Sequence, residues 1–492
     1  MDNLQIEKKI STEIEKLLFQ TEDYKHSDQS IHKIEMGLLG SLLKLGLVLL
    51  HSIISHKSNE LLGHRPEILE GEKLTSKGAV SRQYLSLFGL MSIRRTVHWS
   101  KDRKSYSELD EELSLPKTLW SYNLQELVGE SSSENDFRNS VSLLNKLLKL
   151  GLSGKASQRN AAVLGDQVEQ YYDGKSIELE TTAICFSASF DGKGVPKIVK
   201  PLSPTGNPKK RLGKGEKKGL KEMATVVVTS CFTPKIRDKG SIIRSLMGSG
   251  LTKLKPIKEE EKAGNDNDNR WHEKIHRRAF LADQAKAIEY GLDSIRVRMV
   301  NSESRFVVPI DAGIGLEEKV LAYVKKHKME SQFDGIILDI IHVSEYVWDT
   351  ANAVLGEQLI SRHNWVKRML EDLLDSKVEK VVEDLKLIIE QQDLTDHKIK
   401  QIQKTITYFS NHKHKMDYKT YLAKGYPVSS ALVESACGHL VKQRMEQSGM
   451  RWCSKGAQNM LDLRALKLNG DLEDFIQFVT DTNQHSFYKK AA

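Results

Sequence analysis

The chain has 492 residues, of which 39% are hydrophobic and 28% charged, so its composition is that of a soluble globular protein rather than a disordered one. Its length exceeds what a single hydrophobic core supports and predicts about three domains. Lys and Arg outnumber Asp and Glu by 74 to 66, and the net charge of +8 mildly favours a polyanionic partner. The first residues lack the basic and apolar segments of a signal peptide, and the four cysteines form no Cys-x-x-Cys pair, so we expect a cytoplasmic protein without a disulfide framework.

The N-terminal 60 residues have helical periodicity. Residues 36–54 are the most apolar stretch of the chain, but Lys44 and His51 interrupt it, which favours a buried helix over a membrane span. Residues 82–99 then alternate between apolar and polar side chains around Gly89, and this alternation predicts a short β-hairpin.

Residues 139–150 and 155–171 predict two helices joined by a turn with two glycines. This order is that of a helix-turn-helix. Three side chains at the start of the second helix are suited to reach phosphates and base edges, namely Lys155, Gln158 and Arg159. A plain helical hairpin with a solvated polar face is an equally good interpretation.

Two strands are predicted at 182–191 and 223–232, the first of them ending at Asp191, and a basic segment joins them. The cations clustered in that segment include Lys209, Lys210, Arg211, Lys214, Lys217 and Lys218. A run of charge is usually a solvated loop. Because this one follows a strand-end aspartate, we expect it to contact the phosphates of a nucleic acid.

We expect residues 233–270 to be irregular and residues 271–290 to form a helix. His272-Glu273-Lys-Ile-His276 matches the zinc-protease pattern His-Glu-x-x-His, in which two imidazoles share one helix face. Arginines flank the pattern and no clear third ligand follows it. A basic helix that faces DNA or solvent is therefore the preferred interpretation.

Two further strands, at 305–311 and 333–339, each end in an aspartate, and a helix is expected between them at 316–326. Pro309 has no amide proton, which suggests an edge strand or a bulge. In residues 343–421 apolar side chains recur at three- and four-residue steps, which predicts an all-α block.

Three carboxylates have an order that suits phosphodiester chemistry. Asp191 and Asp311 each end a predicted strand, and Glu434 lies in the first turn of a helix opened by Ser429 and Ser430. Two acids on strands and one on a helix is the order of an RNase H-like nuclease, in which two Mg²⁺ ions stabilise charge on the attacking and leaving oxygens. With 66 acids in the chain, the order alone is a weak signal.

A more specific signal comes from the region around the third acid. Residues 425–444, GYPVSSALVESACGHLVKQR, and 445–458, MEQSGMRWCSKGAQ, closely resemble the third-acid region of bacterial insertion-sequence transposases of the Kra group. Residues 337–348, ILDIIHVSEYVW, contain Asp-x-x-His, a hallmark that this group shares with Mutator-like transposases. Residues 189–192, SFDG, resemble the first-acid motif. The resemblance spans roughly residues 182–471.

The resemblance implies a DDE transposase, which binds insertion-sequence ends, cleaves them and joins 3′-hydroxyls to target DNA with two Mg²⁺ (or Mn²⁺) ions. It implies an α/β fold whose RNase H-like catalytic domain is interrupted by an all-α insertion, preceded by a mainly helical DNA-binding region. The implied partners are double-stranded DNA, at the element ends and the target, and further copies of the chain in a homodimer or larger assembly. The implied location is the bacterial cytoplasm, on the nucleoid when DNA is bound, with no membrane.

Five parts of the chain follow from this interpretation. They are the DNA-binding region with its β-hairpin and candidate helix-turn-helix at 1–175, the first part of the catalytic domain at 176–342, the α-helical insertion at 343–424, the second part of the catalytic domain at 425–475, and a C-terminal tail at 476–492.

The resemblance assigns Asp191 as the first acid and Glu434 as the third. Asp311 is the favoured second acid, although Ala-Gly follows it where related transposases have Gly, and Asp339 is its rival. In the resemblance, Asp339 and His342 form the accessory motif. For His342, a histidine satisfied at a strand–helix junction is the alternative.

Four residues beyond Glu434 are further candidates for DNA contacts: Lys442, Arg444, Arg451 and Trp452. The three cations suit backbone phosphates, and the indole suits stacking on an unpaired base. A solvated basic face and a buried Trp are the alternatives.

Two other functions remain open from the sequence. One is a DNA-binding protein derived from a transposase without catalysis, which the intact acids argue against. The other is a different RNase H-like DNA nuclease, such as a junction resolvase, which would lack the long helical insertion and the Gly-Met-Arg-Trp segment.

Overall fold

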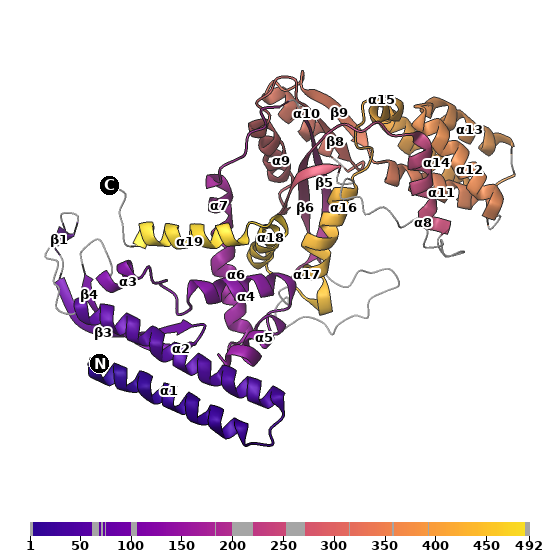
Figure 1. Cartoon of the computed structure of the whole chain (residues 1–492). Coiled ribbons are helices and arrows are strands. Elements are labelled where there is room, and N and C mark those ends of the chain that lie inside the picture. Colours follow the sequence, from indigo (N-terminus) through magenta and orange to yellow (C-terminus); the bar gives the residue numbers. More distant parts are fainter. Residues whose placement is uncertain are drawn as a thin grey trace, which may run out of the picture. The chain divides into compact units, whose positions relative to one another are not determined.

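A computed structural model describes residues 3–61, 68–69, 72–73, 75–99, 106–182, 184–198, 220–251, 271–313, 315–356, 359–391 and 393–487. The chain divides into two compact units. The first comprises Met1–Gly174 and Asp462–Ala492, and the second comprises Lys175–Leu461 (Figure 1).

The first unit begins with two long helices that pack side by side, α1 (Asn3–Lys25) and α2 (Ile31–Leu61) (Figure 1). Among the described side chains of α2, only Ile54 and Ser58 are buried, so the expected buried helix is in fact mostly half-exposed within its unit. By length and hydropathy α2 would suffice to cross a membrane.

The expected β-hairpin is present and longer than predicted. Its strands are β3 (Thr75–Ser86) and β4 (Gly89–Trp99), which pair in antiparallel register up to Ser86 and Gly89. The hairpin packs on α2. Three shorter elements precede or follow it in the chain: β1 (Ile68–Leu69) and β2 (Glu72–Lys73), which pair with one another, and α3 (Glu108–Glu112).

Four helices complete the N-terminal part of this unit, namely α4 (Tyr122–Glu134), α5 (Asn139–Leu148), α6 (Gly154–Gly165) and α7 (Val168–Gly174). The predicted helix at 155–171 is therefore two helices, and the break follows Gly165, a residue that weakens helix propagation. The turn between α5 and α6 is held by Asn145, whose side chain donates to Leu152 O at 2.8 Å and accepts from Leu152 N at 2.7 Å.

The second unit is built on a five-stranded mixed sheet in the order β7-β6-β5-β8-β9. The strands are β5 (Cys185–Pro196), β6 (Lys221–Phe232), β7 (His272–Leu281), β8 (Arg305–Ile310) and β9 (Phe333–Leu338). The first three pair antiparallel, whereas β8 pairs parallel with β5 and β9 parallel with β8.

The helix expected at 271–290 is wrong. Residues 272–281 form β7, which pairs along β6, and the helix α9 (Gln284–Arg298) starts only afterwards. Strand pairing with β6 outweighs the helical pattern, because it satisfies the backbone amides and places the end of β7, Arg278 to Phe280, in the interior. Arg278, for example, is buried with its guanidinium 4.9 Å from the ring centroids of Phe280 and Tyr290.

Pro309 does not mark an edge strand, because β8 lies between β5 and β9. The pairing of β8 with β5 is instead interrupted between the pairs Ser187↔Val307 and Phe190↔Ile310. Pro309 lies within that interruption and has no amide proton to donate. Both strands advance by three residues across this gap, so the register does not shift, and neither the edge strand nor the bulge that the proline suggested lies at Pro309.

Helices cover both faces of this sheet. On one face, α9 and α10 (Leu316–Lys326) pack on alternate residues of β5 and β8, including Phe186, Phe190 and Ile310. The opposite residues, including Cys185 and Val307, join the core of the helical block. That block consists of α11 (Ile340–Leu355), α12 (Leu359–Leu374), α13 (Val378–Gln391), α14 (Asp396–His412), the 3₁₀ turn Lys413–Lys415 and α15 (Tyr418–Ala423).

Residues 233–270 are not wholly irregular as expected. They contain α8 (Lys239–Leu251), whose Ile242 and Ile243 are buried in the core of the helical block. The helix packs on α12 (Figure 1).

The C-terminal part returns to the sheet and then to the first unit. It comprises α16 (Ala431–Ala436), a π-helical segment (Cys437–Lys442), α17 (Gln443–Met445), the 3₁₀ turn Gln447–Gly449, α18 (Ser454–Asn469) and α19 (Leu472–Phe487). Both α16 and the π-helical segment pack on β5, and α19 packs on α4 and α7. The expected C-terminal tail thus begins inside a helix, and residues 462–475 group with the first unit.

Candidate active site

The register between β5 and β8 brings two of the predicted acids, Asp191 and Asp311, side by side. Asp191 was expected to end its strand, but β5 continues to Pro196. It is instead the first residue beyond the parallel pairing with β8, whose last register pair is Phe190↔Ile310. Since Asp311 follows Ile310 directly, both carboxylates emerge from neighbouring strands at the same level of the sheet.

The charge of Asp191 acts on Asp311. Burial and the nearby Asp191 carboxylate raise the pKa of Asp311, although the amide of Gly313 donates to its Oδ1 at 3.1 Å and opposes the shift. The Asp191 carboxylate accepts a hydrogen bond from the amide of Gly192 at 2.6 Å. The two carboxylates therefore repel one another.

Glu434 comes to these acids on α16, which packs on β5 and β6. Its side chain is half-buried, and burial together with the charges of Asp339 and Asp191 raises its pKa, while His342 opposes the shift. The three predicted acids therefore share one electrostatic environment.

His342 lies on the first turn of α11, and its imidazole lies between the carboxylates of Glu345 and Glu434. Its Nε2 is 3.4 Å from Glu434 Oε1, and its Nδ1 is 3.2 Å from Glu345 Oε2. Burial lowers the pKa of His342, but the hydrogen bond to Glu345 and the charges of Asp339, Glu345 and Glu434 outweigh burial and raise it. The imidazole thus holds Glu434 from one side.

Asp339 has a different environment from the other acids, because it is fully buried. It caps α11, with Oδ1 accepting from the amide of Ile341 at 2.8 Å, and its Oδ2 accepts from the hydroxyl of Ser430. The neighbouring amide of Ile340 donates to Val428 O at 2.9 Å. These bonds tie the start of α11 to the segment that leads into α16.

Ligand atoms of Asp339, His342 and Glu434 lie within 4.8 Å of one another. In the part of the chain that the structure describes, this tight group includes neither Asp191 nor Asp311. Each Asp339 oxygen in this group also accepts one protein hydrogen bond.

Two residues of this site lie outside the predicted set. Ser430 was expected to open α16, but its side chain makes no cap bond there and donates to Asp339 instead. Cys437 is buried in the π-helical segment, and its thiol hydrogen-bonds Asp191. Burial and the charge of Asp191 raise the pKa of Cys437 well above its usual range. Nothing in the spacing of either residue signals these contacts.

The predicted DNA-contacting residues fall into three groups. Lys209, Lys210, Arg211, Lys214, Lys217 and Lys218 lie outside the described residues. Lys155, Gln158 and Arg159 are exposed on one face of α6, and Lys442 and Arg451 are exposed in the second unit.

The third group, Arg444 and Trp452, is buried. This is contrary to the DNA contact expected of Arg444, and for Trp452 it confirms the alternative of a buried Trp. Arg444 is inaccessible to solvent, with its guanidinium 5.0 Å from the ring centroid of Trp452. Trp452 is 7% exposed and its indole donates to Met445 O at 3.1 Å. The backbone of Trp452 also bonds Pro196 and Ile198, so this pair anchors the Gly-Met-Arg-Trp segment to the end of β5.

The zinc-protease pattern is not on a helix. His272 and His276 lie on β7 and have separate partners, Ser230 Oγ at 2.9 Å and Tyr290 OH at 2.8 Å. Burial lowers the pKa of His272 to about 4 and that of His276 to about 3, with nearby arginines adding to both shifts. Both imidazoles are therefore neutral packing groups.

Comparison with protein-family models gives no match for this chain, and comparison with curated proteins gives none either. A function for the chain rests on the residues and geometry of the site.

Proposed function

We propose that the chain is a DNA transposase that cleaves and joins DNA strands at a site formed by Asp191, Asp311 and Glu434. The observation that carries the proposal is the strand register. It sets Asp191 and Asp311 side by side where the pairing of β5 with β8 ends. The helix α16, which carries Glu434, packs on β5.

The topology supports an RNase H-like assignment. Three antiparallel strands continue into two strands parallel to the first, in the order β7-β6-β5-β8-β9. The two aspartates follow the pairing of the central strands, and the helical block lies in the chain between β9 and α16. We take this block as the all-α insertion that the sequence resemblance implies.

We assign Asp311, rather than Asp339, as the second catalytic acid. Asp311 is half-exposed and beside Asp191, so its oxygens are accessible to substrate. Asp339 is inaccessible to solvent, and both of its oxygens accept hydrogen bonds. Its bonds to α11 and Ser430 make it a positioning residue for His342 and Glu434.

The donor set fits Mg²⁺ or Mn²⁺. Asp191, Asp311 and Glu434 offer hard oxygen ligands. Burial, and after it the charge of neighbouring carboxylates, raises the pKa of Asp311 and of Glu434, and a divalent cation would stabilise their charged forms. Such ions would supply charge stabilisation on the attacking and leaving oxygens of a phosphodiester. The protein's own contribution is to fix the carboxylates: β5 and β8 hold the aspartates, and His342 holds Glu434.

The proposed substrate is double-stranded DNA. The exposed Lys155, Gln158 and Arg159 lie on one face of α6, which follows a rigid turn as in a helix-turn-helix. We further propose that the chain acts as a homodimer or larger assembly on paired ends. Sedimentation with end DNA checks this, and a single monomeric species on the DNA would contradict it.

The test of this function is strand cleavage and joining on labelled duplexes that carry the ends flanking the gene for this chain. With Mg²⁺, wild type is expected to nick or cut at the ends and to join the 3′-hydroxyl to a second duplex. With EDTA, binding is expected to persist without either product. Binding without cleavage in any divalent cation would favour a DNA-binding protein without catalysis, and cleavage without joining would favour another nuclease.

A further inference from the structure

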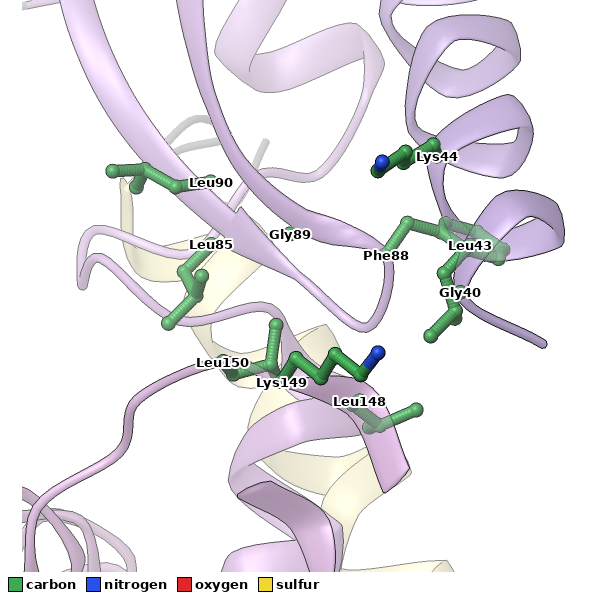
Figure 2. Close-up of a pocket in the computed structure, with 10 residues that line it drawn as sticks. All are labelled: Gly40, Leu43, Lys44, Leu85, Phe88, Gly89, Leu90, Leu148, Lys149 and Leu150. Atoms are coloured by element: carbon green, nitrogen blue, oxygen red, sulfur yellow. The ribbon is translucent and has the colours of Figure 1, made fainter. Parts of the chain in front are cut away.

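A hollow in the first unit has an apolar lining and a basic rim. It measures about 270 Å³ and lies between α2, the tip of the β3–β4 hairpin and the end of α5 (Figure 2). Its apolar lining includes Phe88 and Leu90, which are 42% and 55% exposed. Of the residues that the structure describes, Lys44 and Lys149 are the charged ones in this lining.

The walls of this hollow are fixed by close packing. A Cβ on Gly46 would lie 2.6 Å from the Phe88 ring, so the hairpin tip rests directly on the backbone of α2. Lys149 ends α5 in the left-handed conformation, at φ 54°, and its Nζ is 3.4 Å from the position of a Cβ on Gly40. Lys44 lies one helical turn after Gly40, so both ammonium groups border the same opening (Figure 2).

Lys44 and Lys149 bring two positive charges to the opening. Both are exposed, and no carboxylate among the described residues pairs with either of them. An occupant with a phosphate for the lysines and a less polar body for Phe88 and Leu90 complements the hollow.

We propose that this hollow, the Lys44–Lys149 notch, binds the sugar–phosphate backbone of the DNA that α6 contacts. The turn that joins α5 to α6 supplies Lys149 and Leu150 to the notch and then leads to the exposed face of α6. A strand that reaches Lys155 therefore continues toward the notch. There the two ammonium groups bind phosphate oxygens, and a deoxyribose packs on Phe88 and Leu90. This inference rests on the proposed DNA-binding function.

The test is the salt dependence of binding of the full chain to a fluorescein-labelled 24-base-pair duplex of mixed sequence, without divalent cations. Removing one lysine that binds a phosphate reduces the steepness of log Kobs against log salt by about 0.9, so Lys44→Gln with Lys149→Gln should reduce it by about 1.8. Lys8→Gln with Lys33→Gln is the matched control, because it removes two exposed cations of the same unit, on α1 and α2, that do not line the notch, and its slope should change little.

A steric variant separates a built notch from diffuse charge. Gly40→Leu leaves every charge in place but fills the opening beside Lys149, and it should weaken binding several-fold with folding unchanged by circular dichroism. Equal salt slopes for the notch variant and the control would overturn the inference, as would unimpaired binding by Gly40→Leu.

Two further outcomes keep this inference distinct from the proposed activity. If wild type never cleaves DNA but the notch variants show the reduced slope, the notch stands and the catalytic proposal fails. If wild type binds vesicles of phosphatidylglycerol through Lys44 and Lys149 but binds no duplex, the occupant is an anionic membrane surface and the inference is wrong.

Discussion

Acidic residues that look alike in the sequence have different roles because their surroundings differ. Asp311 and Asp339 each follow a strand of the same sheet. Asp311 is half-exposed beside another carboxylate, whereas Asp339 is fully buried with two protein donors. The first environment suits a group that binds substrate or a cation, and the second suits a group that holds the fold.

The raised pKa of Asp311 predicts a pH-dependent cost to stability. Its folded-state pKa lies above the ordinary 3.8, because burial and Asp191 disfavour the charge and Asp339 adds to this effect, with Gly313 and His342 opposing it. An acid with a raised folded pKa stabilises the fold fully only below its unfolded pKa, and this stability is lost as the pH rises through the folded pKa. In EDTA, Asp311→Asn should therefore melt at a higher temperature than wild type at neutral pH.

That difference should shrink as the pH is lowered toward 3.8, since the wild-type carboxyl is then protonated too. Differential scanning calorimetry across this range measures it. A variant that melts below wild type at neutral pH would contradict the assigned cause of the shift.

Asp339 should instead be required for stability. Asp339→Ala leaves the Ser430 hydroxyl and the Ile341 amide without their acceptor, which costs about 1–3 kcal/mol. Asp311→Ala, which removes no buried acceptor of a side-chain donor, is the comparison. Urea unfolding without divalent cations measures both, and equal losses would remove the distinction between the two acids.

The sequence allowed a residue of the site to be predicted only where that residue belongs to a recognisable motif. Asp191, Asp311 and Glu434 follow predicted strands or start a predicted helix, so their positions could be inferred. The contacts of Cys437 and Ser430 depend on how α16 lies on the sheet, and neither spacing nor periodicity encodes that packing. The burial of Arg444 under Trp452 was missed for the same reason, because an arginine in a basic segment is usually solvated.

Among the structural elements, those with long and regular patterns were predictable. The strands β8 and β9, the helix α10 and the helical block follow the sequence pattern closely. β7 was missed because its amphipathic sequence suits a helix until β6 provides a pairing edge. α8 was missed because its apolar residues Ile242 and Ile243 form a buried face only against the distant helical block.

Gly425, in the segment before α16, lies where two stretches of backbone approach closely. Gly425 has φ +73°, and a Cβ there would lie 2.5 Å from the amide nitrogen of Lys235. Gly425→Ala should therefore lower the free energy of unfolding by about 1–3 kcal/mol. Thermal unfolding measures this, and Gly174→Ala is the control, because its Cβ would meet nothing within 4 Å. Equal stabilities of the two variants would contradict the close approach.

At the scale of the whole molecule, the chain forms two units that the sequence did not separate correctly at the C-terminus. Residues 462–492 group with the N-terminal unit, although the sequence resemblance continued to residue 471. The reason lies in tertiary packing, because α19 buries Phe475 and packs on α4 and α7. A motif resemblance follows the chain, whereas a compact unit follows its contacts.

The central claim is that Asp191, Asp311 and Glu434 act together on DNA while Asp339 supports them. The most direct measurement is the fraction of labelled end duplex cleaved with Mg²⁺ by Asp191→Asn, Asp311→Asn, Asp339→Asn and Glu434→Gln, each shown to bind the duplex. The account predicts no product from the first, second and fourth variants, and residual product from Asp339→Asn. An active Asp311→Asn beside an inactive, folded Asp339→Asn would contradict it and make Asp339 the second catalytic acid.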